Sequence, residues 1–241
     1  MPRFYCGQAL SIGPCITLAE DLAHHVQVLR LGTGDLITLF NGEGGEYTAS
    51  IVALEKKRVS VELKTFSDRE AELPYAITLA QALPESSKMD WIIEKAVELG
   101  ALTIQPLASR RCVVKLSPER AAKRQTHWQA IIVAASEQSG RNRLAHLAAP
   151  SEFKDWVGQQ DLHRRILLSP RGDQSLSDWA RHHPPQAVSL VIGPEGGFTE
   201  DEESLALAKG LIALSMGPRV LRTETAGLAA ISALNAVWGE L

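Results

Sequence analysis

The N-terminal part of the chain carries its hydrophobic residues in short, β-like runs. Leu36–Phe40, Tyr47–Val52 and Val59–Lys64 have the composition of strands, and the glycine-rich segment Asn41–Gly45 supplies a turn between the first two. Ala19–Leu29 has the pattern of one short helix stopped by a glycine. These patterns predict a small β-barrel accompanied by one helix.

After an acidic, polar stretch at Ser67–Glu72, apolar runs alternate with segments of helical spacing. The expected strands are Tyr75–Leu83, Thr103–Leu107, Arg165–Leu168, Val188–Ile192 and Leu211–Leu214. The expected helices are one that Ser87 caps and Gly100 stops, one from Pro118 to about Gln138, one opened by a capping box at Thr199–Glu202, and a closing helix at Thr225–Trp238. Buried strands alternating with helices indicate a parallel sheet, so we predict an α/β domain at residues 73–241 after a barrel domain at residues 1–72.

Charge is distributed unevenly along this chain of 241 residues, whose formal net charge is only −3. Residues 88–143 carry ten basic and five acidic side chains, which gives the segment a local positive excess. The sequence start has no cationic region followed by an apolar run, and no window approaches a membrane span, so we expect a cytoplasmic protein. The three cysteines lack metal-ligand spacing, and we expect neither a metal site nor a disulfide.

Two glycine-containing loops follow buried strands of the expected sheet. Ile192–Phe198 and Leu214–Ala226 both leave the carboxyl end of a strand, where α/β sheets bind their ligands. Glycines let the backbone approach a ligand closely, and Glu195, Arg222 and Glu224 lie in the same two loops. We therefore expect one shared ligand site, although each loop alone has the composition of an ordinary strand-to-helix turn.

The spacing of the glycines leaves the identity of this ligand open. A Rossmann dinucleotide fingerprint needs its glycines at the first strand-to-helix turn, whereas this loop comes near the end of the sequence. A Walker loop is excluded because no Gly-Lys-Ser/Thr follows.

The two loops closely resemble the signature of the SPOUT RNA methyltransferases, in the branch that methylates N3 of a uridine in bacterial 16S ribosomal RNA. The similarity lies in Ile-Gly-Pro-Glu-Gly-Gly-Phe-Thr-Glu-Asp-Glu from Ile192 and in Ser-Met-Gly-Pro-Arg-Val-Leu-Arg-Thr-Glu-Thr-Ala from Ser215. Other similar segments are Pro2–Tyr5, His25 with Val28–Arg30, Lys88–Gly100, Arg110–Lys115 and Ala135–Arg141. Cys112 and Met216 depart from the family pattern without removing a charge or a required glycine.

The resemblance implies a SPOUT α/β domain with a deep trefoil knot, an N-terminal PUA-like barrel that docks RNA, S-adenosylmethionine as cofactor, and a homodimer that binds neither membrane nor DNA. The residues expected around the cofactor are Leu168, Ile192, Gly193, Pro194, Glu195, Gly196, Gly197, Leu214, Met216, Gly217, Leu221, Thr225 and Ala226. The apolar stripe of the closing helix, Leu228, Ile231, Leu234 and Trp238, is a candidate dimer face or else part of the core of its own domain.

Methylation at uracil N3 requires that a proton leave N3 and that the negative charge spreading onto O2 and O4 be stabilised. An arginine can stabilise that charge and a carboxylate can accept the proton. Arg222 is therefore our candidate charge stabiliser, and Glu224 or Glu195 our candidate base. The alternatives are an Arg222–Glu224 ion pair that only fixes the loop, and a turn contact for Glu195.

Contacts with RNA need cations that meet phosphates. Arg120, Lys123, Arg124 and His127 recur on one face of the helix expected from Pro118. The candidate RNA contacts are Arg3, His25, Arg30, Lys88, Lys95, Arg110, Arg111, Lys115 and Arg141. Any one of these could instead be a solvated surface charge.

The resemblance implies an S-adenosylmethionine-dependent methyltransferase acting on a uridine of 16S rRNA in the small ribosomal subunit, and the basic segment and the two loops agree with it. A non-catalytic RNA-binding ribosome assembly factor is one alternative, against which the intact Glu195, Arg222 and Glu224 argue. Others are an enzyme that binds a different adenosine-containing ligand, which the basic segment and the barrel disfavour, and a SPOUT methyltransferase acting on another RNA.

Overall fold

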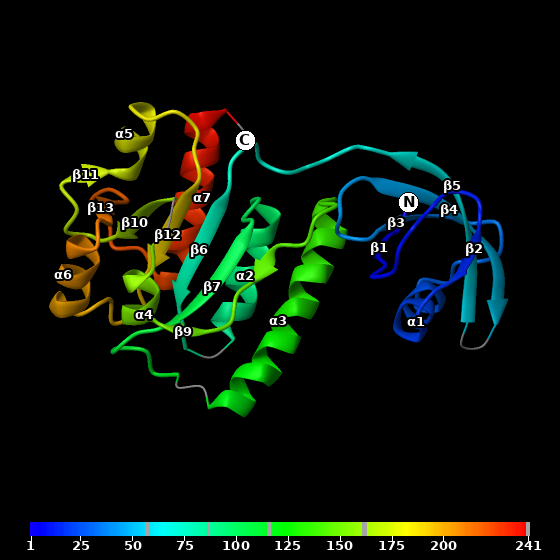
Figure 1. Ribbon diagram of the computed structural model, residues 1–241, viewed down its shortest axis with the longest axis horizontal. Helices are drawn as coiled ribbons and strands as arrows, with labels where there is room; N and C mark the ends of the chain where they lie inside the picture. The colour runs from blue at the N-terminus through cyan, green and yellow to red at the C-terminus, as the bar shows by residue number, and fades with distance from the viewer. Residues whose placement is uncertain (56–57, 86, 115–116, 161–162, 240–241) are drawn as a thin grey trace. The chain divides into compact units, whose positions relative to one another are not determined.

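The structure is a computed structural model that describes residues 1–55, 58–85, 87–114, 117–160 and 163–239. The chain forms two compact units, whose elements are labelled in Figure 1. Unit 1 consists of Met1–Glu72 and Ser136–Leu144, and unit 2 of Leu73–Ala135 and Ala145–Leu241. The sequence gives no signal that Ser136–Leu144 belongs to the first unit.

Unit 1 is built on a five-stranded sheet in the order β1-β3-β4-β5-β2. Its elements are β1 (Arg3–Tyr5), β2 (Cys15–Thr17), α1 (Glu20–Val28), β3 (Leu36–Phe40), β4 (Glu46–Glu55) and β5 (Arg58–Ser67). β1 pairs with β3 in parallel, and the other pairings are antiparallel. The helix and the three longer strands confirm the prediction, except that Arg30, and not a glycine, takes the left-handed position that ends α1. β1 and β2 are too short to leave a periodic signal in the sequence.

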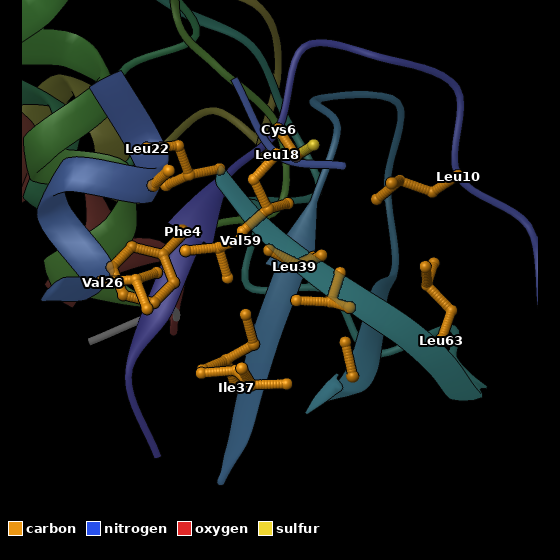
Figure 2. Close-up of a cluster of buried hydrophobic side chains, with 14 residues drawn as sticks. Phe4, Cys6, Leu10, Leu18, Leu22, Val26, Ile37, Leu39, Val59 and Leu63 are labelled. Atoms are coloured by element: carbon orange, nitrogen blue, oxygen red, sulfur yellow. The ribbon is translucent and has the colours of Figure 1, made fainter. Parts of the chain in front are cut away.

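The core of unit 1 is formed by α1 together with the sheet. Figure 2 shows Leu22 and Val26 of α1 and Phe4 of β1 in one cluster with Ile37 and Leu39 of β3. All five side chains are buried. Because so short a helix is not stable in water by itself, burial of its apolar face is what fixes α1 in place.

Unit 2 contains a parallel sheet in the order β11-β13-β10-β12-β6-β7-β8, and β9 pairs with β7. Its strands are β6 (Ile77–Ala82), β7 (Thr103–Ala108), β8 (His146–Leu147), β9 (Ser151–Glu152), β10 (Arg164–Leu168), β11 (Gln174–Ser175), β12 (Val188–Ile192) and β13 (Ile212–Ser215). Every residue of β12 is buried, since this strand lies between β10 and β6. Its continuous apolar run therefore marks a central strand.

The helices of unit 2 follow the predicted order, with two short additions. They are α2 (Lys88–Glu98), α3 (Pro118–Ser139, whose last four residues belong to unit 1), α4 (Phe153–Gly158), α5 (Leu176–Arg181), α6 (Glu200–Ala208) and α7 (Thr223–Trp238). The capping box at the start of α6 is present, with Thr199 and Glu202 exchanging hydrogen bonds. Ser87 precedes α2, but its side chain makes no capping hydrogen bond, contrary to the prediction.

The apolar stripe of α7 lies inside unit 2. Leu228, Ile231 and Leu234 are 8%, 0% and 0% exposed. The indole of Trp238 donates hydrogen bonds to two carbonyl groups at and beyond the end of α5. The stripe is thus core of its own unit, and the expectation that it forms a dimer face is wrong for these three buried residues. No helix within the described ranges is long and apolar enough to cross a membrane.

Candidate functional site

One pocket of about 560 Å³ lies at the carboxyl ends of three strands of unit 2. It is lined by residues 168–170 at the end of β10, 192–198 at the end of β12 and 216–217 and 219–222 after β13, and the start of α7 completes the wall. β13, β10 and β12 are adjacent and parallel, so their carboxyl ends meet at one edge of the sheet. The volume lies within the range of small-molecule sites, about 300–1,000 Å³.

The pocket brings together most residues that the sequence places around one ligand. Its walls include Leu168, Ile192, Gly193, Pro194, Glu195, Gly196, Gly197, Met216, Gly217, Leu221, Arg222, Glu224 and Ala226. Leu214 and Thr225 are not lining residues: Leu214 is buried in β13, opposite Leu168, and Thr225 is exposed on α7.

Several lining residues were not assigned to this site from the sequence. They are Lys88, Ser169, Pro170, Phe198, Glu203, Arg219, Val220 and Thr223. Ser169 and Pro170 directly follow a predicted buried strand, so the rule that selected the other two loops could also have found them. Lys88 carries no such signal, because it comes from a helix more than seventy residues earlier in the sequence.

Glycines give the loops of the pocket their shape. Gly197 and Gly217 have φ angles of +66° and +92°, in the left-handed region that other residues rarely adopt. A Cβ atom on either residue would have no neighbour within 4 Å, so a side chain there would project into open space at the pocket. At Gly193, a Cβ would lie 3.3 Å from the backbone of Gly197, which shows how tightly the first loop is folded.

A buried hydrogen-bond chain joins the first loop of the pocket to α7. The Thr223 hydroxyl donates to the carbonyl of Gly193 at 2.6 Å and accepts a hydrogen bond from the Gln81 side chain at 2.9 Å. Gln81 lies in β6 and is fully buried. These hydrogen bonds fix the first loop and the start of α7 to β6 at the centre of the sheet.

Arg111 holds the same loop from another side. Its Nη1 donates to the carbonyl of Gly196 at 2.8 Å, and its side chain passes 3.3 Å from the position that a Cβ on Gly196 would occupy. This expected RNA contact therefore supports the pocket wall, although Arg111 is still exposed.

Glu195 lies at the pocket wall in contact with Lys88. Its Oε1 accepts hydrogen bonds from Lys88 Nζ at 2.6 Å and from the backbone N–H of Glu85 at 3.1 Å. Burial alone would raise the pKa of Glu195, but the hydrogen bonds from Lys88 and from backbone groups hold this pKa below its ordinary value. The same bond to Glu195 raises the pKa of Lys88, so the pair is ionised at neutral pH.

Arg222 and Glu224 lie at the start of α7, beside this pair. The Arg222 side chain is 83% exposed, and its Nη1 lies 3.9 Å from Glu224 Oε1. Glu224 Oε2 is buried and accepts no hydrogen bond from the described residues, although Lys88 Nζ lies 3.7 Å away. Within the part of the chain that the structure describes, the pocket thus presents a guanidinium with free donors next to a carboxylate with an unused acceptor.

The structure reassigns several of the expected RNA contacts. Arg141 is 2% exposed and forms a two-point ion pair with Glu72, so its guanidinium cannot reach a phosphate and that expectation is wrong. Arg3 is bound to Glu46 and to the side chain of Asn142. Lys95 and Arg110 are engaged by acidic neighbours, as Lys88 is. Lys115 lies outside the described residues. Arg30, Arg120 and Lys123 are exposed cations without an ion-pair partner among the described residues, and the side chain of His25 is exposed as well.

Taken together, the parallel sheet and its glycine-lined pocket define the protein as an α/β protein that binds a small ligand at the carboxyl edge of its sheet. The family follows from comparison with known proteins. A family model described as an RNA methyltransferase domain matches residues 71–235, and one described as an RNA methyltransferase PUA domain matches residues 18–64. The chain belongs to the RNA methyltransferase family and carries its PUA-like domain at the N-terminus.

Relatives are similar over the full chain. The ribosomal RNA small subunit methyltransferase E of Bacillus subtilis (strain 168) is 33% identical, covering 95% of this chain and 92% of the relative. The crystal structure of such an enzyme from Neisseria gonorrhoeae, bound to S-adenosylmethionine, is 40% identical with a TM-score of 0.93 and covers 99% of this chain and 98% of that one. A Legionella pneumophila structure with the same cofactor is 39% identical, with a TM-score of 0.91 and 97% and 96% coverage.

Proposed function

We propose that this protein transfers a methyl group from S-adenosylmethionine to N3 of a uridine in the 16S ribosomal RNA of the small subunit, and that it does so in the cytoplasm. The observation that carries the proposal is the pocket in which Arg222, Glu224 and Glu195 stand beside glycine-rich loops. The names of the full-length relatives support the same substrate class.

The residues of the pocket fit this cofactor. Leu168, Ile192 and Leu221 provide apolar surface for an adenine ring, and the backbone around Gly197 and Gly217 can be approached closely. The acidic side chains at the wall suit a ligand with cationic groups. When bound, the cofactor supplies a methyl group on a positively charged sulfur; the carbon–sulfur bond breaks, a bond to N3 forms, and a neutral thioether is left.

The roles of the side chains follow from their exposure and contacts. Arg222 has donors free to stabilise the negative charge that develops on the uracil oxygens. Glu224 keeps one oxygen without a hydrogen bond from the described residues and is our candidate to accept the N3 proton. Glu195 already accepts two hydrogen bonds through one oxygen, which makes it the weaker candidate base.

For RNA docking, we assign the exposed cations rather than the paired ones. Arg30 provides one in unit 1, where the exposed His25 is a further candidate contact, and Arg120 and Lys123 provide them in unit 2. Their charges attract RNA phosphates without base specificity.

We further propose a deep trefoil knot and a homodimer. β13 is outside β10 in the sheet, yet α7, which follows it, packs against β12 and β6 on the other side of β10. This return of the chain supports a threaded C-terminal segment. Sedimentation at micromolar concentration should show a species of twice 26.2 kDa, and a single 26.2 kDa species would contradict the dimer.

The substrate is tested directly by mass spectrometry of 16S rRNA. RNA from cells that lack the protein should have lost N3-methyluridine at one position, and the purified protein with S-adenosylmethionine should restore the methyl group there. Unmodified RNA after incubation with folded, cofactor-bound protein, offered both as naked rRNA and as assembled small subunit, would contradict the proposal.

The cofactor site is tested with Gly197→Val and Gly217→Val. Each adds a side chain in open space at the pocket, so cofactor affinity measured by calorimetry should fall by at least tenfold. Gly210→Val is the matched control, because Gly210 also has a positive φ, +83°, and an open Cβ position, but lies outside the pocket. Equal cofactor affinity in all three variants would place the cofactor elsewhere.

A further inference from the structure

Lys88 connects two of the acidic residues that line the pocket, Glu195 and Glu224, although its place in the sequence gives no hint of this. It is the first residue of α2, and its ammonium nitrogen lies 2.6 Å from Glu195 and 3.7 Å from Glu224. The Lys88 side chain is about a third exposed and faces the pocket, which it lines. A lysine that contributed only to RNA binding would have no need of two carboxylate neighbours.

The charged groups around this ammonium come from several elements. Glu195 belongs to the loop after β12, and Glu224 and Arg222 to the start of α7, while Glu85 comes from the segment before α2 and interacts through its charge. Glu203 also lines the pocket but is paired with Arg171 at 2.7 Å, and Arg219 lies at the second loop. Among the cations of the described pocket lining, Lys88 is the one that contacts Glu195 directly, through its ammonium nitrogen.

We propose that Lys88 is a positioning residue for the transfer reaction: its ammonium group fixes the Glu195 carboxylate against the wall and balances the charge of Glu224 beside it. This inference rests on the proposed function. Lys88 separates the roles of the two acids, since Glu195 is held through Oε1 while Glu224 keeps its buried Oε2 free of hydrogen bonds from the described residues. One acid remains a fixed anion for a cationic ligand, and the other is left able to take a proton.

The first test needs no ligand. Because the pKa of Glu195 is lowered in the folded protein, the stability that this carboxylate contributes is present above its unfolded pKa, about 4.3, and is lost as pH falls through the folded value. In Lys88→Met, Glu195 is still partly buried but has lost its ammonium partner, so its pKa in the folded protein should rise. The difference in melting temperature between wild type and Lys88→Met should therefore be smallest near pH 4 and grow toward pH 7. Lys88→Arg should restore most of the wild-type dependence.

The second test measures protons and catalysis. Without the ammonium group, the acid limb of the single-turnover rate against pH should move to higher pH, because a close opposite charge no longer favours the ionised carboxylates of the pocket. Calorimetry in buffers of different ionisation enthalpy near pH 6 should detect proton release when S-adenosylmethionine binds Lys88→Met, and none for wild type.

Lys95→Met is the matched control for the cofactor measurements. Lys95 also lies on α2 between two glutamates, Glu94 and Glu98, each 2.7 Å away, but it does not line the pocket. Its loss should leave cofactor affinity and proton release as in wild type. If Lys88→Met bound the cofactor with the wild-type proton count and kept a melting-temperature difference independent of pH, the inference would be overturned. Failure of wild type to bind S-adenosylmethionine would instead overturn the proposed function, and the ligand-free melting data would still decide the role of Lys88.

Discussion

At the scale of single residues, Arg222 is the side chain whose environment best suits an action on the substrate. Its guanidinium is exposed at the pocket wall, and its nearest recorded partner is 3.9 Å away. Arg222→Ala should lower the single-turnover methylation rate by roughly 10²–10³-fold, as for loss of one oxyanion donor, with little change in cofactor affinity. Arg222→Lys should rescue the rate poorly, because a point charge cannot reproduce the planar array of donors.

Two measurements separate the possible roles of Arg222. A near-normal rate in Arg222→Ala would remove it from catalysis. A rate that falls only in proportion to cofactor affinity would assign it to binding, or to the loop-fixing pair with Glu224.

Arg30 has a backbone conformation that is unusual for an arginine. It follows α1 with φ of +56°, and the hydrogen bond from Leu31 N–H to the Val26 carbonyl closes the helix end. The corresponding residues after α2 and α6 are Gly100 and Gly210, as expected for this motif. An arginine in this place costs about 1 kcal/mol of backbone strain, and this cost motivates the hypothesis that its side chain binds RNA.

We therefore expect that one substitution of Arg30 increases stability and weakens rRNA binding. Arg30→Gly should raise the free energy of unfolding by about 1 kcal/mol and weaken rRNA binding, with a shallower salt dependence. Arg30→Ala removes the same charge without relieving the backbone, so it should weaken binding without the gain in stability. Filter binding over a salt series, together with urea unfolding, measures both effects. Unchanged affinity and salt slope would leave Arg30 as a solvated charge.

At the scale of secondary-structure elements, the link between the pocket loops depends on one hydroxyl. Thr223→Val keeps the shape of the side chain but leaves the Gly193 carbonyl without its donor in a buried place. The loss should cost about 1–3 kcal/mol in urea unfolding and lower cofactor affinity, because the first loop is no longer held to α7. Thr225→Val, on the exposed side of the same turn, should change neither. A larger loss of affinity in Thr225→Val would support its predicted place at the cofactor.

Elements with a strong periodic pattern were predictable, and contacts between distant segments were not. The apolar run of β12 and the capping box of α6 each specify a local structure, so the sequence identified both. The two glycine-rich loops could be assigned to one edge of the sheet because each follows a buried strand. The place of Lys88 in their pocket depends instead on how α2 packs in the finished domain. The burial of the cations was not predictable from the sequence for the same reason. Arg141 and Arg30 look alike in the sequence, yet Arg141 is buried in the folded protein and Arg30 is exposed.

At the scale of the whole molecule, unit 1 depends on a segment that lies far along the chain from it. Ser136–Leu144 belongs to this unit, and within it Arg141 donates to both carboxylate oxygens of Glu72, at 3.0 and 2.5 Å. A fragment that begins at Leu73 would therefore expose a surface that the full chain buries and would leave Arg141 without this partner. Deletion of residues 1–72 is thus a poor test of which unit binds RNA, and point variants of the full chain are preferable.

Removal of one partner from the pair between Arg141 and Glu72 should be unusually destabilising. Glu72→Gln removes the carboxylate that pairs with the buried Arg141 guanidinium, and removal of one partner of a buried pair costs about 3–5 kcal/mol. Glu70→Gln is the matched control two residues away, because the pair between Glu70 and Arg143 is solvent-exposed and such pairs contribute about 0–1 kcal/mol. The double variant Glu72→Leu with Arg141→Met should recover much of the loss, since no charge is then left buried. Urea unfolding of the four proteins measures the differences. Equal stabilities of the Glu72→Gln and Glu70→Gln variants would mean that water reaches Arg141 and that Ser136–Leu144 is not held to unit 1 by this pair.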